Sequence, residues 1–139
     1  MFNKLHPRQR EGFTLVEIMI VVAIIALLAA IAIPGFLRAR KRSQAARILN
    51  DLRSIDSAVD QYAIENSKTS GQPIPTAAWT QYIKKGSLLY DTAGNPTVGS
   101  YGAQTVDNIP SILVVGTPPG AGFEALSDVA PSSFWTPYY

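Results

Sequence analysis

The stretch Gly12-Phe13-Thr14-Leu15-Val16-Glu17, followed by an almost unbroken apolar run from Ile18 to Ile33, decides the fold of this chain. From Phe13 to Ile33 there are 21 residues, close to the ~20 that a helix needs to cross a bilayer core of roughly 30 Å. One carboxylate, Glu17, stands inside this segment. An acidic side chain in hydrocarbon costs roughly 2.5–3.5 kcal/mol on insertion scales, so we expect this one to have a function.

Charge and composition exclude several classes of function. The net charge of the 139 residues is +2, and residues 1–12 supply it with three basic residues against one acidic residue; beyond them the chain has nine of each sign. A basic nucleic-acid-binding face is therefore not expected. Cysteine is absent and the one histidine is His6, near the N-terminus. Beyond residue 12 we therefore expect no disulfide, no catalytic triad, no metal site built on cysteine or histidine and no cofactor site, and we expect no enzyme activity.

A second helical pattern follows Pro34-Gly35. Apolar residues recur there at steps of three and four, which places them in one stripe on a helix. We predict one helix from about Phe13 to about Ser67, with a kink or local loosening at Pro34 and an end set by Gly71, Pro73 and Pro75. The members of the stripe are Ala45, Ile48, Leu52, Ile55, Val59 and Tyr62.

Residues 71–139 form a turn-rich head, since they hold eight of the ten glycines and eight of the ten prolines. The fold class is α+β: a long N-terminal helix, apolar then amphipathic, whose stripe packs on a small antiparallel β-sheet head. Within the head we predict a helix over 77–85 capped by Thr76 and ended by Gly86. Strands are predicted over 87–90, 97–101 and 111–115, with a turn over 93–96.

The motif Gly12-Phe13-Thr14-Leu15-Val16-Glu17 resembles the cleavage and methylation motif of type IV prepilins and type II secretion pseudopilins, and Pro34 matches that family's helix-kinking proline. The resemblance is specific over residues 8–40 and generic in the head. It implies that a prepilin peptidase cuts after Gly12 and N-methylates Phe13. It also implies that Glu17 neutralises the Phe13 amine of a neighbouring subunit during assembly.

The resemblance further implies the role of each part of the chain. The chain would be a structural subunit of a type IV pilus-like filament, held in the bacterial inner membrane with its N-terminus in the cytoplasm. It would then polymerise with itself on an inner-membrane assembly platform into a surface pilus. A periplasmic pseudopilus of a type II secretion system is the alternative. The expected parts are a leader (1–12), a membrane and filament-core helix half (13–35), an amphipathic helix half (36–70) and a head (71–139).

Plainer interpretations stay open beside this one. Ala30-Ile31-Ala32 fits the cleavage site of a secretory signal peptide, and Glu17 could be a carboxylate at the bilayer edge of an ordinary anchor that never polymerises. In the head, Asp91, Asn95 and Asp107 could hold a calcium ion, although their spacing matches no loop motif.

The basic cluster Arg38-Arg40-Lys41-Arg42 also allows two interpretations. It could contact lipid phosphates beside the membrane. Alternatively, it could meet an acidic stretch of an adjacent subunit, made up of Asp51, Asp56, Asp60 and Glu65. The opposite sign of the two stretches on one long helix suggests the second interpretation.

Overall fold

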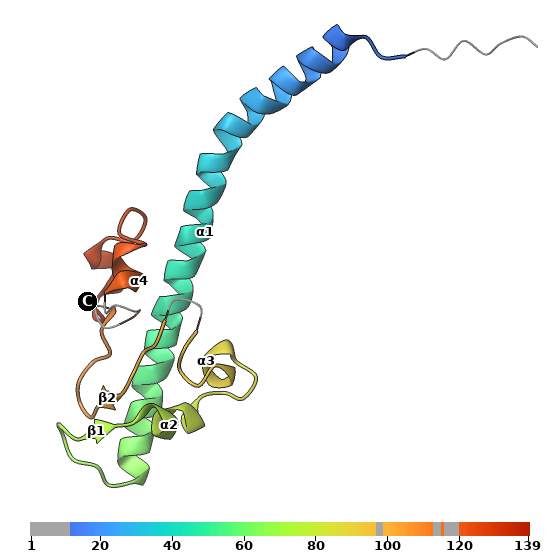
Figure 1. The fold of residues 1–139 in the computed structure, drawn as a ribbon. Helices are drawn as coiled ribbons and strands as arrows, with labels where there is room; N and C mark the ends of the chain where they lie inside the picture. The colour runs from blue at the N-terminus through green and yellow to red at the C-terminus, as the bar shows by residue number, and fades with distance from the viewer. Residues whose placement is uncertain (1–11, 97–98, 113–114, 116–119) are drawn as a thin grey trace, which may run out of the picture. The chain divides into compact units, whose positions relative to one another are not determined.

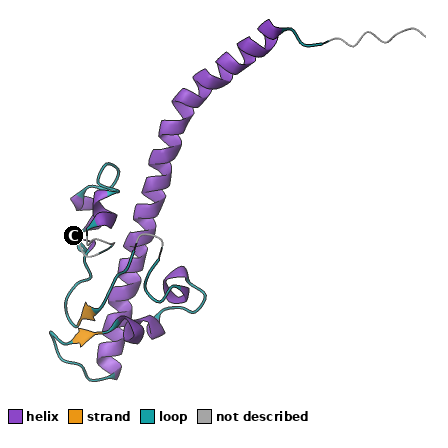
Figure 2. Cartoon of the chain, in the orientation of Figure 1, coloured by secondary structure: helices purple, strands orange, loops and turns teal. Residues whose placement is uncertain are grey.

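The computed structural model describes residues 12–96, 99–112, 115 and 120–139. These residues divide into two compact units, one ending at Leu37 and the other running from Arg38 to Tyr139. The elements, labelled in Figure 1 and coloured by type in Figure 2, are α1 (Leu15–Glu65), β1 (Pro73–Ile74), α2 (Thr76–Trp79), the 3-10 helix η1 (Thr80–Tyr82), α3 (Leu88–Asp91), β2 (Gln104–Thr105), α4 (Ala121–Glu124) and the 3-10 helix η3 (Ser132–Trp135).

The long helix α1 is confirmed: it has 51 residues and continues through Pro34 without a break. Its end differs from the prediction. The backbone NH of Lys68 donates to the carbonyl of Ala63 at 2.9 Å, and Ser67 between them has a φ of 50°. This hydrogen bond around a left-handed residue is a Schellman turn, which satisfies a terminal carbonyl of the helix. The helix therefore ends at Glu65, before it reaches Gly71.

The amphipathic stripe of α1 is confirmed as the core of the second unit. Seven α1 residues are buried there, and Tyr62 is partly buried against them. Head residues complete the core, including Trp79 and Trp135, both fully buried. Each indole NH donates to a backbone carbonyl, of Gly102 and of Ala130 respectively, so neither ring buries an unpaired donor. The buried α1 residues are Ala45, Ile48, Leu52, Ile55, Ala58, Val59 and Ala63.

The α+β class is confirmed, but the strands lie elsewhere than predicted. The sheet has two antiparallel strands of two residues each, with Pro73 opposite Thr105 and Ile74 opposite Gln104. Residues 99–101, 111, 112 and 115 are not strand, while 97–98 and 113–114 lie outside the described residues. The predicted runs are short and lie beside glycine and proline. They lack the alternation of apolar and polar residues that distinguishes a strand from a loop.

The predicted strand over 87–90 is wrong because Ser87 caps a helix. Its side-chain oxygen accepts a hydrogen bond from the backbone NH of Tyr90 at 3.2 Å, which starts α3 at Leu88. The predicted turn does follow, with Ala93 and Gly94 at positive φ, but it follows a helix, and residues 99–101 beyond it are not strand.

The predicted helix over 77–85 is shorter and capped differently. Helix α2 starts at Thr76 itself, with Pro75 in the cap position and no side-chain cap hydrogen bond. It continues as η1, which ends at Tyr82. The hydroxyl of Thr80 donates to the carbonyl of Thr76 at 2.9 Å, so this local bond supports the short helix from within.

Candidate functional site: the N-terminal motif and the helix that follows it

The predicted cleavage site is exposed and lies just before α1. Gly12 and Phe13 have no regular secondary structure, and 84% of the Phe13 surface is accessible. A Cβ added at Gly12 would meet no atom within 4 Å. Among the described residues, nothing covers the bond between these two residues, so it is open to another protein.

Glu17 forms a reciprocal cap with Thr14 at the start of α1. The Oε2 atom of Glu17 accepts from both the backbone NH and the Oγ1 hydroxyl of Thr14, each at 2.8 Å. In return, the Thr14 Oγ1 accepts from the backbone NH of Glu17 at 3.2 Å. This is a capping box, which satisfies backbone donors that a helix start leaves free. Sequence reasoning missed Thr14, although its Thr-x-x-Glu spacing to Glu17 was the signal that could have found it.

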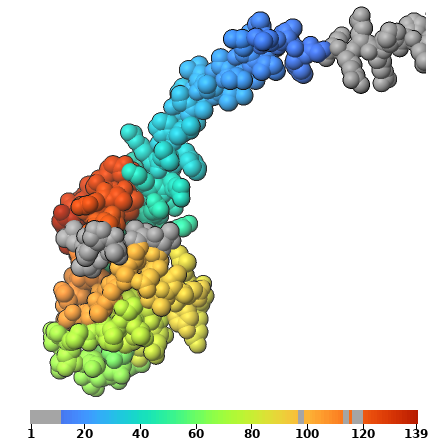
Figure 3. All heavy atoms as spheres, viewed as in Figure 1, coloured from blue at the N-terminus to red at the C-terminus, as the bar shows by residue number. Residues whose placement is uncertain are grey.

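The apolar half of α1 exposes its side chains on all sides. Every residue from Leu15 to Leu37 is exposed except Ala29, which is partly exposed. Figure 3 shows one face of this apolar half, in blue to cyan. This helix is long and apolar enough to cross a membrane, judged by length and composition. A helix that is apolar all round requires lipid or other helices around it. Pro34 lies inside this exposed part, and a Cβ added at Gly35 would contact nothing within 4 Å.

The basic cluster of the sequence is split between paired and unpaired cations. The Nζ atom of Lys41 lies 2.9 Å from a carboxylate oxygen of Asp128 and forms an ion pair with it. Arg38, Arg40 and Arg42 are exposed, and none of them forms an ion pair with a described residue. Because both partners of the Lys41 pair are about half exposed, the pair stabilises the fold by roughly 1 kcal/mol or less.

Most of the acidic stretch on α1 is engaged by tyrosines of the chain's own head. The hydroxyl of Tyr101 donates to Asp51 at 3.1 Å, and that of Tyr82 donates to Glu65 at 2.6 Å. A longer contact of 3.5 Å joins the Tyr138 hydroxyl to Asp56. These contacts link α1 to segments 17 to 82 residues away in sequence.

Two of these carboxyl groups have raised pKa values. Burial raises the pKa of Asp51, although the hydrogen bond from Tyr101 and the charge of Arg47 act against it. Burial also raises the pKa of Asp56, with help from the negative charge of Asp60. Desolvation outweighs hydrogen bonding in both cases, so partial burial disfavours the charged form of these carboxyl groups.

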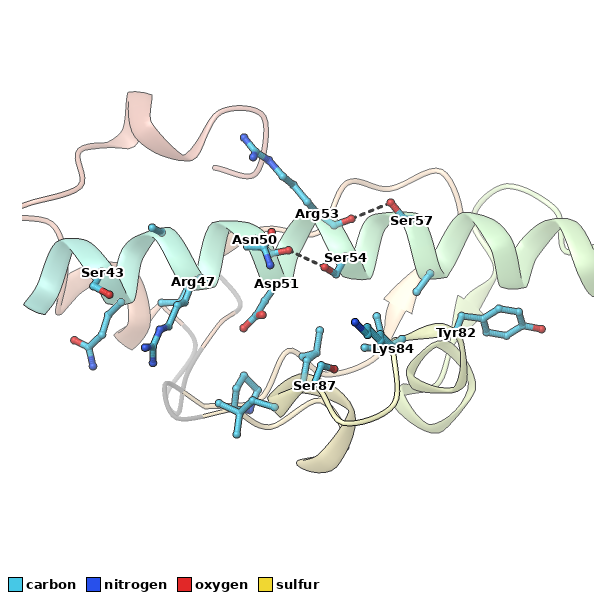
Figure 4. Close-up of a pocket in the computed structure, with 18 of the residues that line it drawn as sticks. Ser43, Arg47, Asn50, Asp51, Arg53, Ser54, Ser57, Tyr82, Lys84 and Ser87 are labelled. Atoms are coloured by element: carbon cyan, nitrogen blue, oxygen red, sulfur yellow. Dashed lines mark hydrogen bonds between the residues drawn. The ribbon is translucent and has the colours of Figure 1, made fainter.

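A groove of about 1020 Å³ runs between α1 and the segment that carries η1 and α3. Arg47 and Asp51 point from α1 toward the loop with Ser87, whereas Arg53 points to the other side of the helix (Figure 4). Two hydroxyls that line the groove donate to backbone carbonyls, Ser54 to Asn50 and Ser57 to Arg53. They are therefore tied to the helix and are not poised as nucleophiles.

A smaller pocket of about 240 Å³ brings Asp56, Asp60 and Asp107 to its lining. In the described part of the chain, however, no three acidic, histidine or cysteine side chains come close enough to hold a metal ion. The calcium site that the sequence suggested at Asp91, Asn95 and Asp107 stays a prediction.

Comparisons with known proteins agree with this geometry at the N-terminus. The family model of the prokaryotic N-terminal methylation motif matches residues 7–33. The type II secretion system core protein G of Pseudomonas aeruginosa is 33% identical over 105 residues, which cover 64% of this chain and 72% of that protein. No solved structure matches the chain.

Two pilins match shorter parts of their own length. The type IV major pilin protein PilA of Myxococcus xanthus is 43% identical over 68 residues, which cover 49% of this chain and 30% of PilA. The type IV major fimbrial protein FimA of Dichelobacter nodosus is 36% identical over 88 residues, or 63% of this chain and 50% of FimA. With its methylation motif, its long N-terminal helix and these relatives, the chain belongs to the family of type IV pilins and type II secretion pseudopilins.

Proposed function

We propose that this chain is the precursor of a structural subunit of a type IV pilus-like filament, and a substrate of processing rather than an enzyme. Residues 1–12 are the leader, and prepilin peptidase cuts after Gly12 and methylates the new amine of Phe13. The single observation that carries the proposal is the methylation-motif match over residues 7–33, which ends at the last residue of the apolar run.

The other parts of the chain take the remaining roles. Residues 13–35 anchor the precursor in the inner membrane, with the N-terminus in the cytoplasm, and later form the filament core. Residues 36–70 and 71–139 are the amphipathic helix half and the head. Assembly on an inner-membrane platform would bury the exposed apolar side chains against those of other copies. In head-to-tail contacts, one surface of a copy meets a different surface of the next copy. Because these contacts do not close into a ring, identical subunits form a fibre.

In this proposal Glu17 gives each incoming subunit its axial position. The Oε2 atom of Glu17 carries both hydrogen bonds from Thr14, whereas no described donor bonds to Oε1. The second oxygen is therefore available to the methylated Phe13 amine of a neighbouring copy. Pairing the two charges relieves the desolvation cost of both in a medium without water. Pro34 would give the helix local freedom to adapt inside the filament.

A pseudopilus of a type II secretion system is the second candidate for the same subunit. The observation that favours it is the length of two matches, since the core protein G of Pseudomonas aeruginosa is covered to 72% and that of Aeromonas hydrophila to 73%, while four other core protein G relatives are covered to 38–44%. The coverage of the pilins PilA and FimA stays at 30% and 50%. A non-polymerising anchored module is the remaining alternative.

The mass of the mature N-terminus tests the proposal most directly. We expect a chain that begins with methylated Phe13 when it is made beside a prepilin peptidase, and the full precursor when the peptidase is absent. A mature chain that begins at Ile33 or keeps residues 1–12 would contradict the proposal. Electron microscopy of sheared surface material then separates the two uses, because abundant long fibres favour a pilus and their absence favours a pseudopilus.

A further inference from the structure

Three exposed arginines lie directly after the apolar half of α1. We call Arg38, Arg40 and Arg42 the arginine collar. All three are exposed and unpaired among the described residues, while the lysine between them, Lys41, is held by Asp128. The structure thus separates one structural cation from three that have no ion-pair partner among the described residues.

The position of the collar places its charge where phosphate groups would meet the helix. It begins one residue after Leu37, and no acidic residue occurs between Glu17 and Asp51 to offset it. Arg38 and Arg42 are four apart and so lie on one face of α1, while Arg40 lies on another. A guanidinium binds phosphate oxygens through two parallel hydrogen bonds, and its stem can lie along apolar surface.

The acidic stretch of an adjacent subunit is the less suitable partner. Three of its four carboxylates, Asp51, Asp56 and Glu65, already accept hydrogen bonds from tyrosines of their own head. Moving these carboxylates to a neighbour would leave three tyrosine hydroxyls without their acceptors. Asp60 is exposed, and of the four carboxylates it is the one that forms no hydrogen bond or ion pair with a described residue. One free carboxylate does not match three free arginines.

We propose that the arginine collar binds the headgroup phosphates of anionic phospholipids where α1 leaves the bilayer. The proposal rests on the part of the proposed function that puts residues 13–35 in a membrane, and it does not depend on polymerisation. Its consequence is a subunit that waits in the membrane with anionic lipid bound, and that must exchange this lipid for protein when it is extracted.

Native mass spectrometry of the full-length chain in detergent tests this. Phosphatidylglycerol and phosphatidylcholine are each added as the probe, to the wild type, to the collar variant R38Q/R40Q/R42Q and to a control variant K84Q/K85Q. The control removes two exposed cations of the head far along the chain from the collar. At about fivefold per arginine, we expect phosphatidylglycerol affinity to fall on the order of 100-fold in the collar variant and to stay unchanged in the control.

Several results would overturn the proposal. They are equal binding of the two lipids by the wild type, undiminished phosphatidylglycerol binding by the collar variant, and full competition by millimolar inorganic phosphate, which would indicate a general anion site. A collar variant that keeps its lipid but loses filaments would assign the collar to a neighbouring subunit instead.

Two controls separate this test from that of the proposed function. Tryptophan fluorescence checks that each variant keeps its folded head, since both tryptophans are fully buried there. The N-terminal mass checks processing. A wild-type chain that carries methylated Phe13 but shows no preference for phosphatidylglycerol refutes the collar alone, whereas an unprocessed wild-type chain refutes the proposed function.

Discussion

The two halves of α1 form one continuous helix but have different surroundings. From Leu15 to Leu37 the large apolar side chains of α1 are exposed, whereas from Ala45 to Ala63 a stripe of them is buried in the core of the second unit. The two halves differ in how their apolar residues are distributed around the helix axis. The first half is apolar on all faces, so no single face of a small head could cover it, while the second half concentrates its apolar residues on one face. A continuous helix therefore does not imply one continuous environment.

The first prediction concerns the polar end of the exposed half. Replacing Glu17 with Ala removes the acceptor of both Thr14 hydrogen bonds and the proposed partner of the neighbouring amine. We expect filaments to disappear from sheared material while the chain is still cut after Gly12. Electron microscopy and the N-terminal mass measure the two outcomes. Glu124→Gln, which neutralises an exposed carboxylate of the head, should assemble normally. Wild-type amounts of filament from Glu17→Ala would refute the assigned role.

The second prediction sets one isoleucine of each half against the other. Ile55 is fully buried, so Ile55→Ala should lower the free energy of unfolding by about 2–5 kcal/mol through lost contacts and a cavity. Ile25 is 60% exposed, and Ile25→Ala should change it by less than about 0.5 kcal/mol. Urea unfolding of the full chain in detergent, followed by tryptophan fluorescence, gives both values. Equal losses would mean that the two halves are not independent.

The third prediction tests how tightly the head packs beside the buried half. Gly94 has a φ of 78°, and a Cβ placed there would lie 2.7 Å from the Thr76 side chain and 2.8 Å from the Trp79 ring. Gly94→Ala should therefore cost about 2–4 kcal/mol of unfolding free energy, from backbone strain and the steric clash together. Gly102→Ala is the matched control, because Gly102 has a φ of 66° and open space around its Cβ. It should cost only about 1 kcal/mol, from backbone strain alone. The same urea titration compares the two, and a control as costly as Gly94→Ala would exclude the steric cause.

The smallest expected effect is on pH dependence. Burial raises the pKa of Asp51, so the folded state holds this proton more tightly than the unfolded state does. The contribution of this group to the free energy of unfolding therefore increases as pH falls from neutrality toward the ordinary aspartate value of 3.8. Asp51→Asn removes it, while its amide oxygen can still accept from Tyr101. Relative to wild type, the variant should be slightly more stable at neutral pH and should lose this advantage in acid. If the stability advantage of Asp51→Asn over wild type grew as the pH fell, the result would contradict a raised pKa of Asp51 in the folded state.

Sequence reasoning was accurate where a periodic signal was long. The helix from about Phe13 to about Ser67 and its buried stripe were predicted because apolar residues spaced by three and four over 18 residues match the period of an α-helix. For the head, the prediction was accurate only in its fold class, α+β. Its elements have two to four residues each, and one serine side chain at Ser87 was enough to convert a predicted strand into a helix.

The candidate site divides in the same way. Gly12, Phe13, Glu17 and Pro34 were named from a local motif, and their roles stay predictions. The hydrogen bonds from Thr14 were equally local and could have been found from the capping-box spacing. The tyrosine partners of Asp51 and Asp56 could not, because they come from positions 50 and 82 residues away and depend on how the whole head packs.

The contact between Tyr138 and α1 has a consequence for biosynthesis. Tyr138 is buried, and its carbonyl accepts a hydrogen bond from the NH of Ile112, so the head closes only when nearly all of the 139 residues have been made. The stripe of α1, by contrast, emerges from the ribosome among the first 63 residues. At roughly 5–20 residues per second it would remain uncovered for several seconds, unshielded and prone to aggregation. We therefore expect the nascent chain to need a holding factor that covers this stripe, and late truncations to be cleared by proteolysis rather than accumulate.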